Sequence, residues 1–145
     1  MLHRLVVVVP LLAAMLASPA AAEIGRVKST IGTASVQRDA AHIPASIGME
    51  LLPGDWLETG KDGRITLTFI DNTRFAVGPD SRIALTKFDY DRTSQKGEFI
   101  AQVERGSIAV VSGKISKGGR DAMQLRTPDG VLDVRGTRFI VEVRP

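Results

Sequence analysis

Apolar and polar residues alternate along most of this chain. The segment 64–69 reads RITLTF, which places Ile65, Leu67 and Phe69 on one face of an extended strand and polar side chains on the other. The same period of two recurs in segments that are separated by short runs of Gly, Pro, Asp, Asn and Ser. These segments are 74–77, 82–88, 99–103, 131–134 and 139–143. The alternation predicts strands that each bury one face.

No segment has a sustained helical period. The one candidate, 40–52, is interrupted by Pro44 and Gly48. We therefore expect an all-β fold of about ten short strands, arranged either as a sandwich or as a roll or solenoid of stacked turns. A weak repeat of strand and polar turn between Gly54 and Tyr90 favours the roll, although a plain meander would give the same pattern. Two polar stretches are expected to be exposed loops, 89–97 and 112–120.

The first 22 residues differ from the rest of the chain. A short basic start containing Arg4 precedes an apolar run from Leu5 to Ala17, and small residues fill most of positions 18–22. This is the layout of a helical secretory signal peptide, with cleavage expected after Ala22. An uncleaved membrane anchor is the alternative, but a span needs about 20 apolar residues and this run is shorter. We expect a cleaved signal peptide, 1–22, and a single exported domain, 23–145, with no membrane span after cleavage. The periplasm is the first expected compartment, and secretion is the second.

The chain offers few side chains for catalysis or metal binding. It has no cysteine, and the expected exported domain has one histidine, His42, in an expected loop. A Ser-His-Asp triad would need His42 as its base, and a zinc site would need three or four ligands. The acidic pairs Asp55 with Glu58 and Asp89 with Asp91 are interpreted as turn residues rather than as catalytic carboxylates. We expect no catalytic residue, no metal, no cofactor and no enzyme activity.

Positive charge collects in the last part of the chain. Residues 105–145 hold 8 basic and 4 acidic side chains, whereas residues 23–104 hold 10 basic and 12 acidic ones. Arg126, Arg135 and Arg138 stand near turns, where they would form either a patch for an anionic partner or an ordinary solvated strand edge. Nucleic acid is disfavoured as a partner, because the domain is expected to be exported and has few aromatic residues for base stacking.

Several short motifs follow one another along the expected domain. They are Gly54-Asp55-Trp56-Leu57-Glu58-Thr59-Gly60, the segment 75–83, Glu104-Arg105-Gly106-Ser107-Ile108, Thr127-Pro128 and Val134-Arg135-Gly136-Thr137-Arg138-Phe139-Ile140-Val141. This ordered set resembles the FecR domain family, and the similarity spans about Gly25 to Val143. The resemblance implies motif residues that define the fold rather than react. These are Gly54, Asp55, Thr59, Gly60, Gly106, Thr127, Pro128, Arg135, Gly136, Thr137 and Phe139.

Local chemistry suggests why some of these residues are needed. The Asp55 carboxylate is expected to accept hydrogen bonds from backbone donors of its own turn. Gly136 is expected to allow a close backbone approach or a positive φ, and Gly130 is expected to tolerate a positive φ after Pro128 and Asp129.

The resemblance also implies a role in binding. The best-known family members join this domain to an anti-sigma segment, a membrane helix and a further C-terminal domain, whereas this chain is expected to be a free-standing exported module. Its expected partner is an envelope protein, in signal sensing or regulation, and strand edges are the natural docking surface. The alternative is a cell-wall or exopolysaccharide polymer. A tentative binding surface combines Trp56 and Tyr90, as sugar-stacking rings, with Arg126 and Arg138.

Overall fold

The computed structural model describes residues 22–136 and 138–144. The expected signal peptide therefore lies almost entirely outside the described residues. No helix in the described part of the chain is long and apolar enough to span a membrane. The elements are β1 (Gly25–Ile31), β2 (Ala34–Arg38), β3 (Ala41–Pro44), β4 (Glu50–Leu51), β5 (Trp56–Thr59), β6 (Arg64–Phe69), β7 (Arg74–Val77), β8 (Arg82–Asp91), β9 (Lys96–Val111), the 3-10 helix η1 (Ile115–Gly118), β10 (Met123–Thr127), β11 (Gly130–Asp133) and β12 (Arg138–Val143). The prediction of an all-β fold is confirmed.

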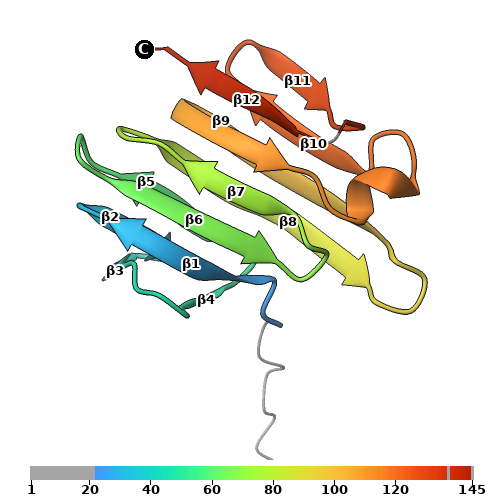
Figure 1. The fold of residues 1–145 in the computed structure, drawn as a ribbon, viewed down its shortest axis with the longest axis horizontal. Coiled ribbons are helices and arrows are strands. Elements are labelled where there is room, and N and C mark those ends of the chain that lie inside the picture. The colour runs from blue at the N-terminus through green and yellow to red at the C-terminus, as the bar shows by residue number, and fades with distance from the viewer. Residues whose placement is uncertain (1–21, 137, 145) are drawn as a thin grey trace, which may run out of the picture.

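The twelve strands form one hydrogen-bonded sheet that folds over into two layers, with β9 shared between them (Figure 1). Layer 1 has the order β4-β1-β6-β7-β9-β12, and layer 2 has the order β3-β2-β5-β8-β9-β10-β11. β10 runs parallel to β9, and the other described strand pairs are antiparallel. The layered arrangement corresponds to the sandwich alternative. The chain changes layer between β5 and β6 and again between β7 and β8, and the strands that pair there, β2 with β5, β6 with β7 and β8 with β9, are antiparallel neighbours in one curled sheet.

The long strand β9 joins the two layers. Its first part pairs with β8 and β10 in layer 2, and its last part, from Gly106 onward, pairs with β12 and, from Ile108, with β7 in layer 1. Gly106 lies at this change of layer and has φ +93°. A left-handed backbone at this position lets one continuous strand turn from one layer into the other.

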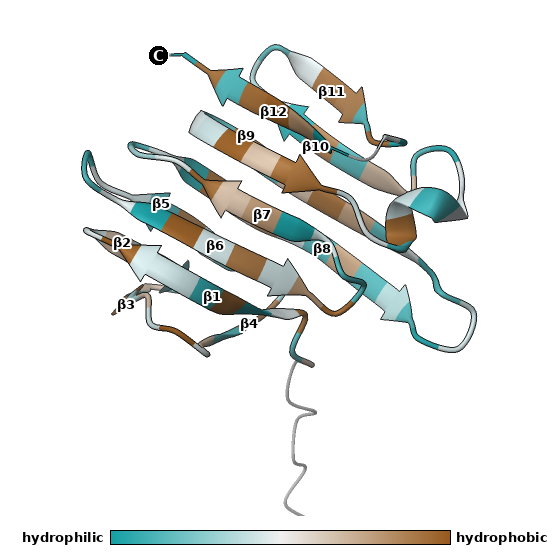
Figure 2. Ribbon diagram, in the orientation of Figure 1, coloured by the Kyte–Doolittle hydropathy of each residue, from teal (hydrophilic) through white to brown (hydrophobic). Residues whose placement is uncertain are grey.

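The alternation seen in the sequence becomes the core between the layers (Figure 2). Phe99 stands at its centre, with ring centroids 4.8 Å from Phe69, 5.5 Å from Phe75 and 4.8 Å from Phe88. These rings come from both layers, because Phe69 and Phe75 lie on β6 and β7 and the other two lie on β8 and β9. The aromatic cluster therefore fixes how the layers face each other.

Two expected loops are more ordered than the sequence suggests. In the stretch 89–97, β8 continues to Asp91 and β9 starts at Lys96, which leaves a short hairpin turn. In the stretch 112–120, η1 carries the buried residues Ile115 and Ser116. Both stretches are polar in composition, but the backbone of the first is paired across a hairpin and the second buries Ile115. His42 also lies on a strand, β3, and not in a loop.

Candidate functional site

The Gly54-Asp55 motif forms a tight turn before β5. The Asp55 N–H donates to the Leu52 carbonyl over 3.2 Å, and Gly54, after Pro53, has φ +87°. This is the arrangement of a type II turn, which favours proline and then glycine at its centre. The turn is held against β8, because the Gly54 N–H donates to the Leu85 carbonyl and the Leu85 N–H donates to the Asp55 carbonyl.

The Asp55 side chain is 1% exposed and serves the fold. Its two carboxylate oxygens accept from Arg38 Nε at 2.9 Å and Arg38 Nη2 at 2.8 Å, and Oδ2 also accepts from the Leu52 N–H. The hydrogen bond to Asp55 raises the pKa of Arg38 above its ordinary value, so the guanidinium stays charged at neutral pH. The stability that the Arg38–Asp55 pair contributes would be lost only as the pH rises through the raised pKa of Arg38. The expected capping role of Asp55 is present, with an added cation from β2.

Arg38→Met should lower the free energy of unfolding by about 2 kcal/mol, because it leaves a buried carboxylate with one remaining donor. Chemical denaturation at neutral pH measures this difference. The matched control is Arg64→Met, which removes an exposed arginine from β6 and should change stability by less than about 0.5 kcal/mol. Equal effects of the two substitutions would show that the Arg38–Asp55 pair contributes nothing specific.

A second group of motif residues ties β5 to the turn that leads from β7 to β8. The Thr59 hydroxyl donates to the Gly78 carbonyl over 2.6 Å and accepts from the Ser81 N–H over 3.0 Å. The buried Ser81 hydroxyl in turn accepts from the Ser107 N–H. Ser81 occupies space that a side chain on residue 106 would need, since a Cβ on Gly106 would lie 2.1 Å from the Ser81 Oγ. These contacts join β5, the turn before β8 and the bend of β9 at Gly106.

Gly60 lies next to this group. Its N–H donates to the Thr33 carbonyl over 2.9 Å, and a Cβ on Gly60 would meet the Thr33 Cβ at 3.1 Å. The glycine therefore lets the end of β5 pass close to the turn between β1 and β2.

The sequence analysis did not single out Asp71, although it is fully buried. Its carboxylate accepts from the Thr73 N–H at 3.0 Å, the Thr73 hydroxyl at 2.8 Å and the Ile115 N–H at 3.1 Å. The Thr73 hydroxyl also accepts from the Gly113 N–H. Asp71 thus anchors the segment leading into η1. Its own turn was visible in the sequence, but its partners more than 40 positions away had no local signal.

The C-terminal motif residues lie around the hairpin formed by β10 and β11 and along β12. Thr127 pairs with Gly130 across the turn that contains Pro128, and Phe139 is half-buried against the core. Arg135 Nε lies 3.2 Å from Asp133 Oδ2. Thr137 lies outside the described residues.

The predictions for Gly130 and Gly136 are wrong. Neither residue has a positive φ, and a Cβ on either would meet no atom within 4 Å. Gly136 lies in open space on the link between β11 and β12, and its carbonyl accepts from the Ser112 hydroxyl. The sequence alone does not separate a glycine that the backbone requires from one that another residue could replace. The space around the Cα and the φ angle separate them.

The four residues of the tentative binding surface do not converge. Trp56 and Arg126 lie on the outer face of layer 2. They belong to one line of paired residues across the strands, but Ala84 and Gln102 lie between them. The Arg82 guanidinium lies 3.9 Å from the Trp56 ring centroid, so one face of the indole is occupied. Tyr90 is half-buried against the core, and Arg138 lies on β12 in layer 1.

The titratable residues weighed for catalysis are also separated. His42 is exposed, and its Nδ1 lies 3.9 Å from Glu58 Oε2. Glu58 is held mainly by Arg82 at 2.9 Å, whereas Asp55 faces Arg38. Across 22–136 and 138–144, no group of three or more His, Asp or Glu residues is placed to hold a metal ion.

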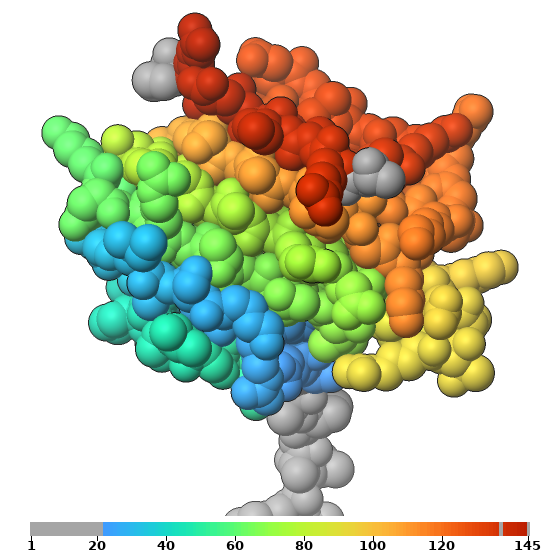
Figure 3. All heavy atoms as spheres, viewed as in Figure 1, coloured from blue at the N-terminus to red at the C-terminus, as the bar shows by residue number. Residues whose placement is uncertain are grey.

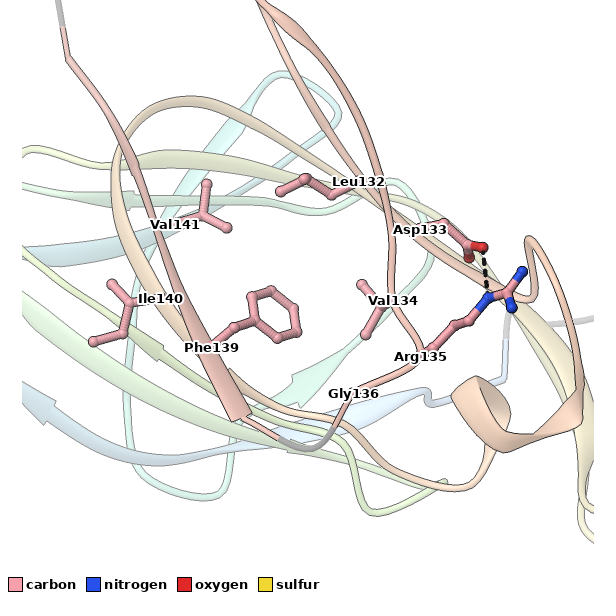
Figure 4. A pocket seen from close by; sticks show the side chains of 8 residues that line it. All are labelled: Leu132, Asp133, Val134, Arg135, Gly136, Phe139, Ile140 and Val141. Carbon is pink, nitrogen blue, oxygen red and sulfur yellow. Dashed lines mark hydrogen bonds and ion pairs between the residues drawn. The ribbon is translucent and has the colours of Figure 1, made fainter.

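An apolar cleft lies between β11 and β12 (Figure 4). Among the strands that the structure describes, β11 pairs with β10 alone and β12 pairs with β9 alone, so each ends its layer on the same side of the sandwich. The cleft between them has a volume of about 280 Å³, and apolar side chains dominate its lining. They are Leu132, Val134, Phe139, Ile140 and Val141. On the opposite side of the sandwich, the segment 45–49 crosses between the layers and covers the edge, through hydrogen bonds from Ala45 to Ala34 and between Gly48 and Val27.

The comparisons with known proteins gave one match. A family model described as "FecR protein" matches residues 55–145, which takes in β5 to β12. The strands β1 to β4 precede the matched range, although Val27, Val36 and Leu51 complete the same core. Searches of curated proteins and of solved structures returned no match.

Proposed function

The chain belongs to the FecR protein family, and on that premise we propose that it is a non-enzymatic binding module of the bacterial cell envelope. It docks an extended segment of a partner protein at the open edge formed by β11 and β12, and this binding serves signal regulation. Residues 1–22 direct its export, and the exported domain, 23–145, works in the periplasm.

The observation that carries this proposal is the apolar cleft at an unpaired strand edge. Natural proteins usually protect such edges with charges, prolines or covering segments, because an open edge pairs readily with other chains. Here the two edge strands instead expose large apolar side chains: on β11, Leu132 is 46% exposed and Val131 is 59% exposed, and on the outer face of β12 Ile140 is 76% exposed. An edge of this kind is typical of a site that a partner covers.

Strand addition explains how such a site would recognise a partner. A segment lying beside β12 extends the ladder by backbone hydrogen bonds, which supply affinity. Every second side chain of that segment then points toward the cleft beside Phe139 and Val141. The expected partner segment is therefore extended, with apolar residues at alternate positions.

The roles of the buried acidic residues support a binding role over an enzymatic one. Asp55 is held by Arg38, and Asp71 is held by the segment leading into η1. Both carboxylates are engaged in maintaining turns. The alternative of a sugar-stacking site at Trp56 and Tyr90 receives less support, because Arg82 covers one ring and the core packs against the other.

A photo-crosslinking amino acid placed at Leu132 should trap a discrete envelope protein in intact cells, identifiable by mass spectrometry. Adding Val141→Lys should reduce this product at least about tenfold, because the charged side chain would be buried by the docked segment. The matched control carries the crosslinker at Ile47, which is 72% exposed on the opposite side of the sandwich and should not trap that protein. A melting temperature close to that of the unsubstituted protein would show that Val141→Lys still folds.

Three outcomes would contradict the proposal. They are the absence of a product from Leu132, a product that Val141→Lys leaves unchanged, and a product that consists of a second copy of this chain.

A further inference from the structure

The outer face of layer 1 carries cations that have no carboxylate partner within the described residues. Lys28, Arg64, Arg74 and Arg138 are all exposed, and they lie on β1, β6, β7 and β12. Figure 3 shows the face that these strands form. None of them lies within 4.0 Å of a carboxylate in the described part of the chain. The acidic residues at the margins of the face are already engaged, since Glu23 and Glu50 contact Arg26, and Glu142 contacts Arg144.

Layer 2 shows the opposite pattern. On its outer face, Arg82 lies 2.9 Å from Glu58 and 2.7 Å from Glu104, and Lys87 lies 2.9 Å from Glu98. Arg82 and Lys87 are therefore balanced by carboxylates of neighbouring strands, whereas Lys28, Arg64, Arg74 and Arg138 of layer 1 face solvent together. Like charges on one face repel one another, and a bound anion would relieve the repulsion.

The strand register of layer 1 places the cations beside a row of small side chains, which we call the floor. One row across the strands contains Arg74 and Arg138, which are two strands apart, or about 10 Å. The next row contains small residues and ends at Ile140. Its members are Ser29, Thr66, Ala76 and Ala109.

Two adjoining hollows, of about 310 and 290 Å³, share Thr66, Ala76 and Ala109. Arg64 lines one hollow, and Lys28 and Arg74 line the other. We call this surface the basic trough. It crosses five strands, from β1 to β12, so its length is about 19 Å.

We propose that the basic trough binds a linear acidic polysaccharide whose carboxylates pair with Arg64, Arg74 and Arg138. Guanidinium groups bind carboxylates through two parallel hydrogen bonds, and arginines about 10 Å apart suit a polymer of acidic sugars in which alternate carboxylates face the trough. The hydroxyls of Ser29 and Thr66 hydrogen-bond each other over 2.5 Å in this row, and their remaining acceptor positions can meet sugar hydroxyls. This ligand goes beyond the protein partner proposed for the edge of β11 and β12.

Other polymers fit the trough less well. The side chains that face outward in the two rows include no aromatic ring, so nucleic acid would lack stacking partners. The trough lies on the face of paired strands, where the backbone groups are already hydrogen-bonded, so a peptide cannot add as a further strand there.

Titration of the purified protein with polygalacturonate, and with neutral dextran for comparison, tests the proposal. The unsubstituted protein should bind polygalacturonate and not dextran, and added salt should weaken binding. Arg64→Glu/Arg74→Glu should weaken it at least about tenfold. The matched control is Arg92→Glu/Arg120→Glu, which changes the net charge equally at exposed positions in the connections that follow β8 and η1 and should alter the affinity less than about twofold.

A second pair of variants tests whether the shape of the trough, apart from its charge, contributes to binding. Ala76→Phe fills the floor of the trough without changing the charge and should also weaken binding about tenfold. Thr86→Phe, at an exposed position on β8, should not. Circular dichroism spectra and melting temperatures like those of the unsubstituted protein would show that each variant folds.

The proposal is overturned if the unsubstituted protein fails to bind polygalacturonate, or if the control variants weaken binding as much as the trough variants. It is also overturned if DNA or anionic lipid vesicles bind as tightly as polygalacturonate at the same salt concentration. The two trough variants and their two controls all leave β11 and β12 unchanged, so failure here and failure of the crosslinking experiment are distinguishable.

Discussion

Gly106→Ala should lower the free energy of unfolding by about 4 kcal/mol, enough to remove much of the stability of a domain of this size. Gly106 has φ +93°, a conformation in which a side chain is strained. A Cβ at this position would also lie 2.1 Å from Ser81 Oγ and 2.5 Å from Ser81 Cα. Rotation of the serine side chain cannot relieve the second contact, so the backbone of β9 or of the turn before β8 must move. Chemical denaturation followed by circular dichroism measures the loss.

Gly136→Ala is the matched control for this prediction. Gly136 belongs to the same set of motif residues, but a Cβ there would meet no atom within 4 Å and its φ is not positive. The substitution should change stability by less than about 0.5 kcal/mol. Similar effects at the two glycines would contradict the assignment of Gly106 as the residue that lets β9 pass between the layers.

Phe99→Ala should lower the free energy of unfolding by about 4 kcal/mol, because it removes a fully buried ring from the centre of the core. The ring contacts Phe69, Phe75 and Phe88, which come from both layers, so the resulting cavity would lie where the layers meet. Neither layer can close over the space by itself, which limits relaxation. Thermal and chemical denaturation would both report the change.

Phe99→Leu is the graded control, since it keeps most of the buried volume while losing the aromatic contacts. It should cost about 1–2 kcal/mol. A loss below about 1 kcal/mol for Phe99→Ala would mean that the two layers are not held together by this cluster.

The two proposed binding surfaces meet at β12. Phe139 and Val141 line the cleft toward β11, whereas Arg138 belongs to the basic trough on the outer face of layer 1. This follows from the alternation of side chains along a strand, which gives neighbouring residues opposite faces. A protein partner at the edge and an acidic glycan on the face would therefore occupy adjacent, separate surfaces of the module.

Much of the fold is predictable from local patterns. The segment 64–69 forms β6 with the expected buried face, and the Gly54-Asp55 turn forms where its residues indicate. The ordered motifs that resemble the FecR family agree with the match to residues 55–145. The prediction that 89–97 is a loop was wrong at both ends of the segment, where β8 and β9 pair. An exposed hairpin and a loop have similar polar compositions, so the sequence does not separate them.

The sequence predicted less about the candidate binding surfaces than about the strands and turns. The sequence shows an excess of basic residues near the C-terminus, Arg138 among them, but the trough also needs Lys28, Arg64 and Arg74 from earlier in the chain. These residues come together only through the order β1-β6-β7-β9-β12. The rings proposed for sugar stacking, Trp56 and Tyr90, are engaged by other parts of the molecule.

The sequence by itself determined that the chain forms strands, which face of most strands is buried, and where the principal turns occur. These properties depend on the alternation of side chains and on the backbone preferences of glycine and proline, which act over a few residues. Only the tertiary structure decided that two layers share β9, that Gly106 is sterically required while Gly136 is not, and that one edge is open and one face is unbalanced in charge. These properties depend on register and close contacts between residues far apart in the chain, which no local pattern encodes.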